Sequence, residues 1–323
     1  MADPNQGQTI ASTYEEVYPN EPTDNIFSSN STMKAFDKDG FKRSAPGGRL
    51  FESPLEYAQN TTMQMVGEEQ ALDTTRVAVF DCARYDQKIC AGTINYTLLQ
   101  ELQNSGGDRK FDLIAGLIEN GRKSHLQLLT TQTWNTSTPS TNELTALPTI
   151  ISSTPTTGTV GGINAATFTW WRNRQNSGAK TTVIYDNLQS SFRTTWNQCS
   201  LGGVMMTPTA IVSDPTTFGG FEGTMVTVLR YMTTDLRKNG DPGFMTAAIN
   251  FKETPYFYDE LAPAASAYML NNQVLKFEYL QWMKLWPAVD PANQLAYILK
   301  MSTVGNYICA GRRYLGVVTA TTS

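Results

Sequence analysis

The chain has 323 residues, of which 25 are basic and 29 acidic, giving a net charge of −4. Charged residues make up 17% of the chain, below the roughly 25% of an average soluble domain, so we expect another molecule to cover part of the surface. One histidine and four scattered cysteines argue against structural zinc. The chain has no block of five like charges, which argues against a dedicated nucleic-acid-binding surface. At about 150 residues per domain, the length fits two domains or one large intertwined domain.

The first 25 residues have no basic segment followed by an apolar one, so they are not a signal peptide. The cysteines are therefore expected to be reduced, and the protein to fold in the cytoplasm. No apolar run approaches the roughly 18 residues that a membrane span requires, which predicts no membrane partner.

Residues 1–46 are polar and carry only isolated apolar side chains. Such a segment cannot bury enough surface to offset its ordering entropy, so we expect it to be either disordered or an arm lying on a neighbour.

Residues 47–92 are predicted to form a long β-hairpin. RLFESPLEYAQNTTMQMV and TTRVAVFDCARYDQKICAG both have extended character, and a polar tip at Gly67-Glu68-Glu69 joins them. An isolated two-stranded ribbon is marginal in water. We therefore expect this hairpin to lie against another subunit, with Gly67, Glu68, Glu69 and Arg76 making inter-subunit contacts.

Two helices are predicted next, a short one over 93–103 and a longer one over 108–131. Asn104-Ser105-Gly106-Gly107 is the stop signal between them. His125 falls on the apolar stripe of the longer helix, where a satisfied core histidine is far commoner than a ligand or base. The Thr/Ser/Pro-rich stretch 131–162 follows, either as a domain seam or as a surface loop within one domain.

The segment TFTWWRNRQ combines Trp170 and Trp171 with Arg172 and Arg174. Aromatic residues beside arginine could stack on bases. Without a wider basic patch, we favour a strand or interface segment whose indoles need partners, and assign Trp170, Trp171 and Arg172 to inter-subunit contacts.

The second half alternates helix and strand. A helix ends near Cys199, a strand spans 209–213, and Asp214-Pro215 begins another helix, which indicates a mixed α/β unit. The last third is rich in apolar strands, with Gly305-Asn306 predicted as a turn between two of them. Arg312 and Arg313, beside Tyr314, are interpreted as an interface ion-pair site.

We find no phosphate loop, dinucleotide fingerprint, nucleophile elbow or zinc-hydrolase motif, so no catalytic, cofactor or metal residue is assigned and an enzyme is the weaker hypothesis. That weaker hypothesis is a cytoplasmic enzyme using surface carboxylates.

The order of segments resembles the major capsid proteins of tailed bacteriophages, of the Hong Kong 97 type with the Johnson fold. The resemblance rests on GFMTAAINFKETPYFYDE, on AYMLNNQVLKFEYLQWMKLWP through CAGRRYLGVV, and on GGINAATFTWWRNRQ and NQCSLGGVMMTPTAIVSDPTTFGGFE. It covers most of residues 47–318.

The resemblance implies an α+β fold divided along the chain. The expected parts are an N-arm (1–46), a long E-loop hairpin (47–92), the spine helix and first part of the P-domain (93–179), an α/β A-domain (180–272), and returning P-domain and A-domain strands (273–323).

The implied function is that of a structural protein. Hexamers and pentamers would tile the icosahedral head of a virion, assembled in the bacterial host cytoplasm around double-stranded DNA that is not read by sequence. Because only 46 residues precede the hairpin, a separate scaffolding protein is expected, beside a portal and decoration proteins. An encapsulin-like nanocompartment shell of the same fold is the alternative.

Overall fold

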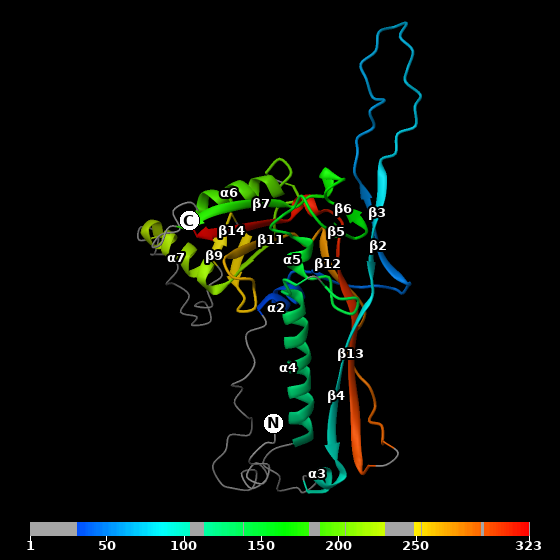
Figure 1. The fold of residues 1–323 in the computed structure, drawn as a ribbon, viewed down its shortest axis with the longest axis vertical. Coiled ribbons are helices and arrows are strands. Elements are labelled where there is room, and N and C mark those ends of the chain that lie inside the picture. The colour runs from blue at the N-terminus through cyan, green and yellow to red at the C-terminus, as the bar shows by residue number, and fades with distance from the viewer. Residues whose placement is uncertain are drawn as a thin grey trace.

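The computed structural model describes residues 31–103, 113–137, 139–180, 188–203, 205–229, 249–252, 254–291 and 294–322. These residues form an upright spine of one long helix and a four-stranded sheet, a six-stranded sheet with two helices, and a β-hairpin that projects beyond both (Figure 1). The predicted α+β class is confirmed.

The spine sheet joins distant parts of the chain. Its strand order is β1 (Lys42–Ser44), β12 (Leu275–Leu285), β13 (Ala296–Cys309), β4 (Lys88–Thr97). β1 is parallel to β12, and the other neighbours are antiparallel. α4 (Leu113–Thr133) runs beside β4, and Gly121 allows the close approach because a Cβ there would collide with the Ile94 side chain.

β4 and α3 (Leu98–Gln103) correct two predicted boundaries. The hairpin does not continue to residue 92, because residues 88–97 pair with β13. The short helix does not begin at residue 93 either, since Ile94 and Tyr96 alternate along the strand instead. Of the longer helix, residues 108–112 lie outside the described residues.

The six-stranded sheet has helices on one face. Its order is β7 (Arg174–Lys180), β14 (Gly316–Thr322), β11 (Ser266–Leu270), β8 (Ala210–Ser213), β10 (Thr254–Tyr258), β9 (Ile249–Phe251). α6 (Leu188–Cys199) and α7 (Pro215–Leu229) share one apolar cluster with Ile211 and Val318. Val212 and Val317, the alternate residues, face the central core. The first strand of this sheet along the chain begins at Arg174, and the boundary expected at residue 180 stays a prediction.

The predicted start of α7 is confirmed. The helix begins at Pro215, and the Thr217 backbone N–H donates to Asp214 Oδ2 at 3.2 Å. Asp214 therefore satisfies one of the backbone donors that a helix N-terminus leaves unpaired.

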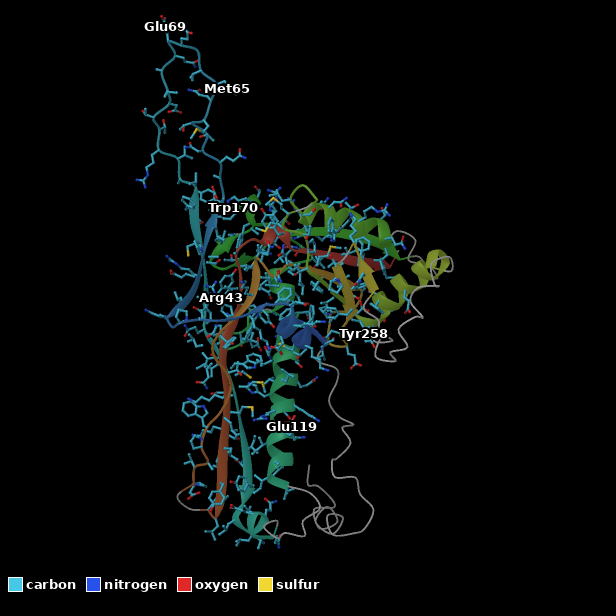
Figure 2. All side chains as sticks on the ribbon, turned by 180° about the vertical axis from the view of Figure 1, so that it is seen from behind. Arg43, Met65, Glu69, Glu119, Trp170 and Tyr258 are labelled. Carbon is cyan, nitrogen blue, oxygen red and sulfur yellow. The ribbon has the colours of Figure 1, made fainter. Side chains whose placement is uncertain are left out.

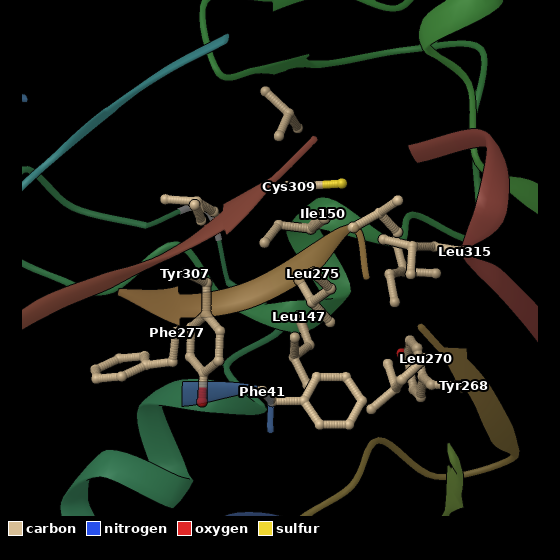
Figure 3. Packing of buried hydrophobic residues seen from close by; sticks show 14 of the residues in the cluster. Phe41, Leu147, Ile150, Tyr268, Leu270, Leu275, Phe277, Tyr307, Cys309 and Leu315 are labelled. Carbon is tan, nitrogen blue, oxygen red and sulfur yellow. The ribbon is translucent and has the colours of Figure 1, made fainter. Parts of the chain in front are cut away.

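One core connects the two sheets. Figure 3 shows Phe277 and Tyr307 of the spine sheet packing near Leu147 and Ile150 of α5 (Leu147–Ile150), with Leu270 of the six-stranded sheet close by. The stretch 131–162 therefore is not a domain seam, because α5 lies inside this core. Since both sheets share the cluster, they form one intertwined unit.

Residues 31–46 are part of this core rather than a free arm. α2 (Ser31–Lys38) buries Met33 and Phe36, and Phe36 stacks on Phe41 with ring centroids 4.6 Å apart. This corrects the prediction that residues 31–46 are disordered or lie on a neighbour. Their few aromatic side chains anchor this segment in the core of its own chain. Residues 1–30 lie outside the described residues.

Gly305 and Asn306 are not a turn but the middle of β13. Asn306 is fully buried, and its amide donates to Asp86 O at 2.7 Å and accepts from the Thr145 N–H at 2.9 Å. The side chain thus connects the strand to the hairpin base and to the loop before α5. Gly305 lies against the neighbouring strand, where a Cβ would be 2.6 Å from Glu278 O and 3.0 Å from the Phe277 ring.

Gly305→Ala is expected to lower the free energy of unfolding by about 1–3 kcal/mol, because Glu278 O belongs to the paired backbone and cannot yield. Urea unfolding of the unassembled subunit measures it. Gly92→Ala is the matched control, since nothing lies within 4 Å of a Cβ at Gly92, and its effect should stay within about 0.5 kcal/mol. Equal effects of the two variants would contradict this account.

His125 is the buried core histidine that was predicted. It lies 5% exposed, with Nε2 2.8 Å from Thr303 Oγ1 and Nδ1 3.7 Å from Cys90 Sγ. The Met283 N–H donates to the same hydroxyl at 3.1 Å. His125 therefore connects α4 to β13 and, through Thr303, to β12.

Burial lowers the pKa of His125, which gives a pH dependence of known sign. Between the folded pKa and the unfolded value of about 6.5, the unfolded chain binds more protons, so stability is lost as pH falls through this window. We expect urea unfolding of the wild-type protein to lose more stability on acidification from neutral pH than His125→Gln. Parallel pH profiles of the two proteins would contradict the prediction.

Candidate inter-subunit surfaces

The hairpin consists of β2 (Leu50–Glu56) and β3 (Phe80–Asp86), continued by two irregular legs, residues 57–79 (Figures 1 and 2). Regular pairing is therefore shorter than the two long strands that were predicted. The lower part is anchored, since alternate residues such as Phe51 and Tyr85 are buried. Beyond Tyr57, the legs project away from the body of the molecule (Figure 2).

The hairpin legs expose an apolar surface. Met63 is 79% exposed, Met65 fully exposed and Leu72 67% exposed, with Phe80 at the start of β3 72% exposed. Side chains of this kind gathered on one projecting segment mark an interaction site. Sequence reasoning missed them, although the uncharged run TTMQMV was a usable signal.

The backbone of the legs is also largely unpaired within the chain. Between Tyr57 and Val79 the backbone-to-backbone hydrogen bonds are Tyr57 N to Val79 O, Met63 N to Asn60 O and Gln70 N to Gly67 O. Within the described residues, the backbone of residues 64–66 has no hydrogen-bond partner in its own chain. An extended segment with free donors and acceptors is able to pair with another strand.

The four residues predicted at the hairpin tip are all exposed. Gly67, Glu68, Glu69 and Arg76 lie on the legs. Nearby, hydrogen bonds from the Thr75 hydroxyl and backbone N–H lower the pKa of Asp73. These side chains are free to meet a neighbour, and their inter-subunit role stays a prediction.

The Trp170 segment holds the hairpin base in place. It forms the 3-10 helix η1 (Thr169–Trp171) rather than a strand. Trp170 is half-buried and stacks on Tyr57 with centroids 5.1 Å apart, and Arg172 donates to Ala165 O at 2.8 Å. Trp171 is 1% exposed and donates to Val160 O at 3.0 Å. This corrects the expectation for Trp171, which can neither contact a neighbour nor stack on a base.

Arg312 is likewise buried rather than at an interface. It lies in η3 (Arg312–Tyr314), 1% exposed, and donates to Ile150 O at 2.7 Å, Trp171 O at 3.2 Å and Asn173 Oδ1 at 3.1 Å. The predicted ion-pair site is therefore wrong for Arg312, because the guanidinium satisfies carbonyl groups inside the subunit. Arg313 is exposed, and its predicted contact stays open.

A second apolar surface lies at the opposite end of the molecule, at the foot of the spine. α3, residues 286–291 after β12 and residues 294–295 before β13 form it. Its exposed side chains are Leu99, Leu102, Trp286, Val289 and Leu295, the last 80% exposed. Sequence reasoning missed this surface too, because these residues read as ordinary helix and strand positions.

The described residues contain no group of three or more histidine, cysteine or acidic side chains able to hold a metal ion. In the same part of the chain, no helix is long and apolar enough to cross a membrane. All four cysteines are free thiols, with Cys199 and Cys309 buried.

Solved structures of phage capsids superpose on nearly the whole chain. A chain of the cyanophage A-1(L) capsid asymmetric unit matches with a TM-score of 0.70 at 12% identity, covering 98% of this chain and 100% of that one. The chain has a phage-capsid fold.

The capsid fold recurs among further similar structures. The capsid of the empty GTA particle matches with a TM-score of 0.65 at 11% identity, covering 98% of each chain. The capsid of the Myoviridae phage XM1 matches at 0.60 and 12% identity, covering 95% of this chain and 97% of that one. No protein-family model and no curated protein sequence matches the chain. The resemblance is therefore one of three-dimensional structure, and the capsid fold explains why the order of elements, more than any motif, indicated it.

Proposed function

We propose that the chain is the major capsid protein of a tailed bacteriophage, which assembles as hexamers and pentamers into an icosahedral head. The observation that carries the proposal is the match of full length to full length with the cyanophage A-1(L) capsid chain. A match over part of the fold would leave room for a different function in the remainder, but here both chains are covered almost completely.

The described surfaces support a subunit that functions in an assembly. The hairpin legs and the foot of the spine expose apolar side chains at opposite ends of the molecule (Figure 1). Two separate adhesive surfaces on one chain allow it to bind several neighbours at once. The low charge fraction of 17% agrees with a surface that neighbours largely cover.

The proposal assigns each part of the shell subunit to described elements. We assign the E-loop to residues 50–86, the spine helix to α4, the P-domain to the four-stranded sheet with α4, and the A-domain to the six-stranded sheet with α6 and α7. Residues 1–30 are the N-arm in this proposal. The A-domain begins at Arg174, where β7 enters its sheet.

The proposed partners are those of a phage head. The shell encloses double-stranded DNA without recognising its sequence. The net charge of −4 agrees with a shell that does not bind the DNA phosphates tightly. A separate scaffolding protein directs assembly, and a portal and decoration proteins complete the virion. Assembly takes place in the cytoplasm of the bacterial host, and the chain catalyses no reaction.

The proposal is tested by measuring mass in solution. The full chain is expressed with the genes that neighbour its own, and light scattering is recorded on the purified product. Multiples of five or six subunits of 35.7 kDa, or far larger closed particles, are expected. A species that stays at the monomer mass with every neighbouring gene present would contradict the proposal.

A further inference from the structure

One segment of the subunit, residues 159–172, contacts both strands of the hairpin. It contains the short strands β5 (Thr159–Val160) and β6 (Ile163–Asn164), followed by η1. The turn between β5 and β6 meets β3, and Trp170 of η1 meets the leg that continues β2. The direction in which the hairpin leaves the body is therefore open to control from this segment.

The contact with β3 is close and leaves little room for movement. The Arg84 N–H donates to Gly161 O at 3.0 Å. Gly161 has a φ of +60°, and a Cβ there would be 2.9 Å from Ala83 Cβ and 3.0 Å from the Tyr85 ring. Because β3 lies directly against this turn, the lower part of the hairpin is fixed, and only the part beyond it can change direction.

The contact with the other strand is a single pair of stacked rings. Tyr57 extends the β2–β3 pairing by one step, since its N–H donates to Val79 O at 3.0 Å. Its ring stacks on Trp170, with centroids 5.1 Å apart and planes 21° apart. Figure 2 shows Trp170 at the level where the legs leave the body. Stacking depends on the relative orientation of the two rings, so this pair opposes tilting of the legs.

Trp170 is held firmly by its own neighbours. Trp171 packs edge-on against it at 5.7 Å and is anchored by its Nε1–H, which donates to Val160 O at 3.0 Å. Arg172 donates to Ala165 O at 2.8 Å, which ties the end of η1 to the residues after β6. The surface that the hairpin leg meets is therefore continuous with the core of the subunit.

We infer that Trp170 is a positioning residue, whose stack on Tyr57 fixes the direction of the hairpin before any neighbour binds. The legs beyond Tyr57 act as a lever. Over ten extended residues, about 33 Å, a tilt of about 10° at the base moves the tip by about 6 Å, which exceeds the roughly 4.8 Å spacing of neighbouring strands. A hairpin without this contact would reach its neighbour at many different angles.

The inference rests on the proposed shell function and adds a control of particle size to it. When every hairpin leaves its subunit in one direction, every subunit meets its neighbour at one angle, and that angle sets the curvature of the shell. The stack of Tyr57 on Trp170 therefore narrows the range of particle diameters. The competing explanation is that the neighbour alone directs the hairpin, in which case loss of the stack changes nothing.

Distances within the unassembled subunit test the positioning role without any particle. Spin labels are attached to Met65→Cys on the hairpin and Gln198→Cys on α6, both exposed, in a chain that carries Cys82→Ser and Cys90→Ser. We expect Trp170→Ala to broaden the distribution of label distances at least twofold. Trp170→Phe, which keeps an aromatic ring able to stack, should leave the distribution unchanged.

Two further variants make the distance measurement decisive. Tyr57→Ala removes the other ring, so it should broaden the distribution as much as Trp170→Ala does, and the double variant should broaden it no further. Trp286→Ala is the matched control, because that tryptophan is 43% exposed at the foot of the spine. Urea unfolding confirms that each variant is folded, and Tyr57→Ala serves alone if Trp170→Ala does not fold. An unchanged distribution in Tyr57→Ala, or equal broadening in Trp286→Ala, would overturn the positioning role.

Particle diameters test the link to shell size. Electron microscopy of Trp170→Ala particles, expressed with the neighbouring genes, is expected to show a spread of diameters at least twofold wider than that of the wild type. The wild-type spread, together with broadened distances in the free subunit, would overturn the link to size. Failure of the wild-type chain to form particles would remove the proposed function itself, whereas the distances in the free subunit would still decide the role of Trp170.

Discussion

Deleting Gly67 to Asp73 from the hairpin tip is expected to leave the subunit folded and to prevent it from assembling into shells. Every residue of this stretch is exposed. Its hydrogen bonds are local, from Gln70 N to Gly67 O, from Gly67 N to Gln70 Oε1 and from Thr75 N to Asp73 Oδ1. The free energy of unfolding should change by no more than about 0.6 kcal/mol, because shortening a loop alters closure entropy only slowly. Assembly should fail because the shortened hairpin cannot reach its neighbour.

Two measurements on the deletion variant separate folding from assembly. Urea unfolding of the subunit reports stability, and sedimentation of the product expressed with its neighbouring genes reports particles. A variant with a seven-residue Gly/Ser segment in place of residues 67–73 restores the length of the hairpin without its native side chains. Its particle yield shows whether assembly needs the length or the side chains. Global unfolding of the deletion variant, or normal particle yield, would contradict an intermolecular hairpin.

Arg312→Met is expected to destabilise the subunit by about 3 kcal/mol or more. Methionine retains much of the apolar volume of the arginine side chain. It removes the N–H groups that donate hydrogen bonds to Ile150 O, Trp171 O and Asn173 Oδ1. Each buried acceptor left unsatisfied costs about 1–3 kcal/mol. Because these acceptors belong to α5, η1 and the segment that enters β7, the loss loosens the junction of the two sheets.

Arg313→Met is the matched control for that loss. The two arginines are adjacent in η3, but Arg313 is exposed, so its substitution should change the free energy of unfolding by less than about 0.5 kcal/mol. Arg312→Lys keeps the positive charge but lacks the forked N–H groups of the guanidinium. Its loss in the free energy of unfolding should lie between those of Arg312→Met and Arg313→Met. If Arg312→Met and Arg313→Met unfold at the same urea concentration, the buried role of Arg312 is wrong.

Much of the fold could be predicted because its elements carry local signals. Asp214-Pro215 supplies a cap and a first-turn proline, and α7 begins there. Leu188, Phe192 and Trp196 recur at helical spacing and are buried on α6. The order of these elements was sufficient to indicate the capsid fold, since it depends on many weak local signals agreeing.

The sequence-based predictions were wrong where contacts with distant parts of the chain outweighed the local residue composition. Gly305-Asn306 has the composition of a turn, but both residues lie within β13. The Asn306 side-chain amide hydrogen-bonds to two other segments. Position 305 requires glycine because the neighbouring strand leaves no room for a Cβ. Residues 31–46 look too polar to pack, yet Phe36 and Phe41 reach the central core. Neither partner is visible from the sequence near these residues.

The candidate interfaces were harder to predict than the fold. Trp171 and Arg312 were chosen because aromatic and arginine residues are common at interfaces, but the same properties let them hold a buried junction together. Met63 and Met65 were not selected by residue type. Only their exposure on a projecting segment indicates that they contact another molecule. Exposure in three dimensions, rather than residue type, separates the two groups.

Electron microscopy of the full chain expressed with its neighbouring genes tests the central claim most directly. The account predicts closed icosahedral shells, or rings of five and six subunits, with each hairpin lying across the next subunit. Only isolated monomers, with every neighbouring gene product present, would contradict it.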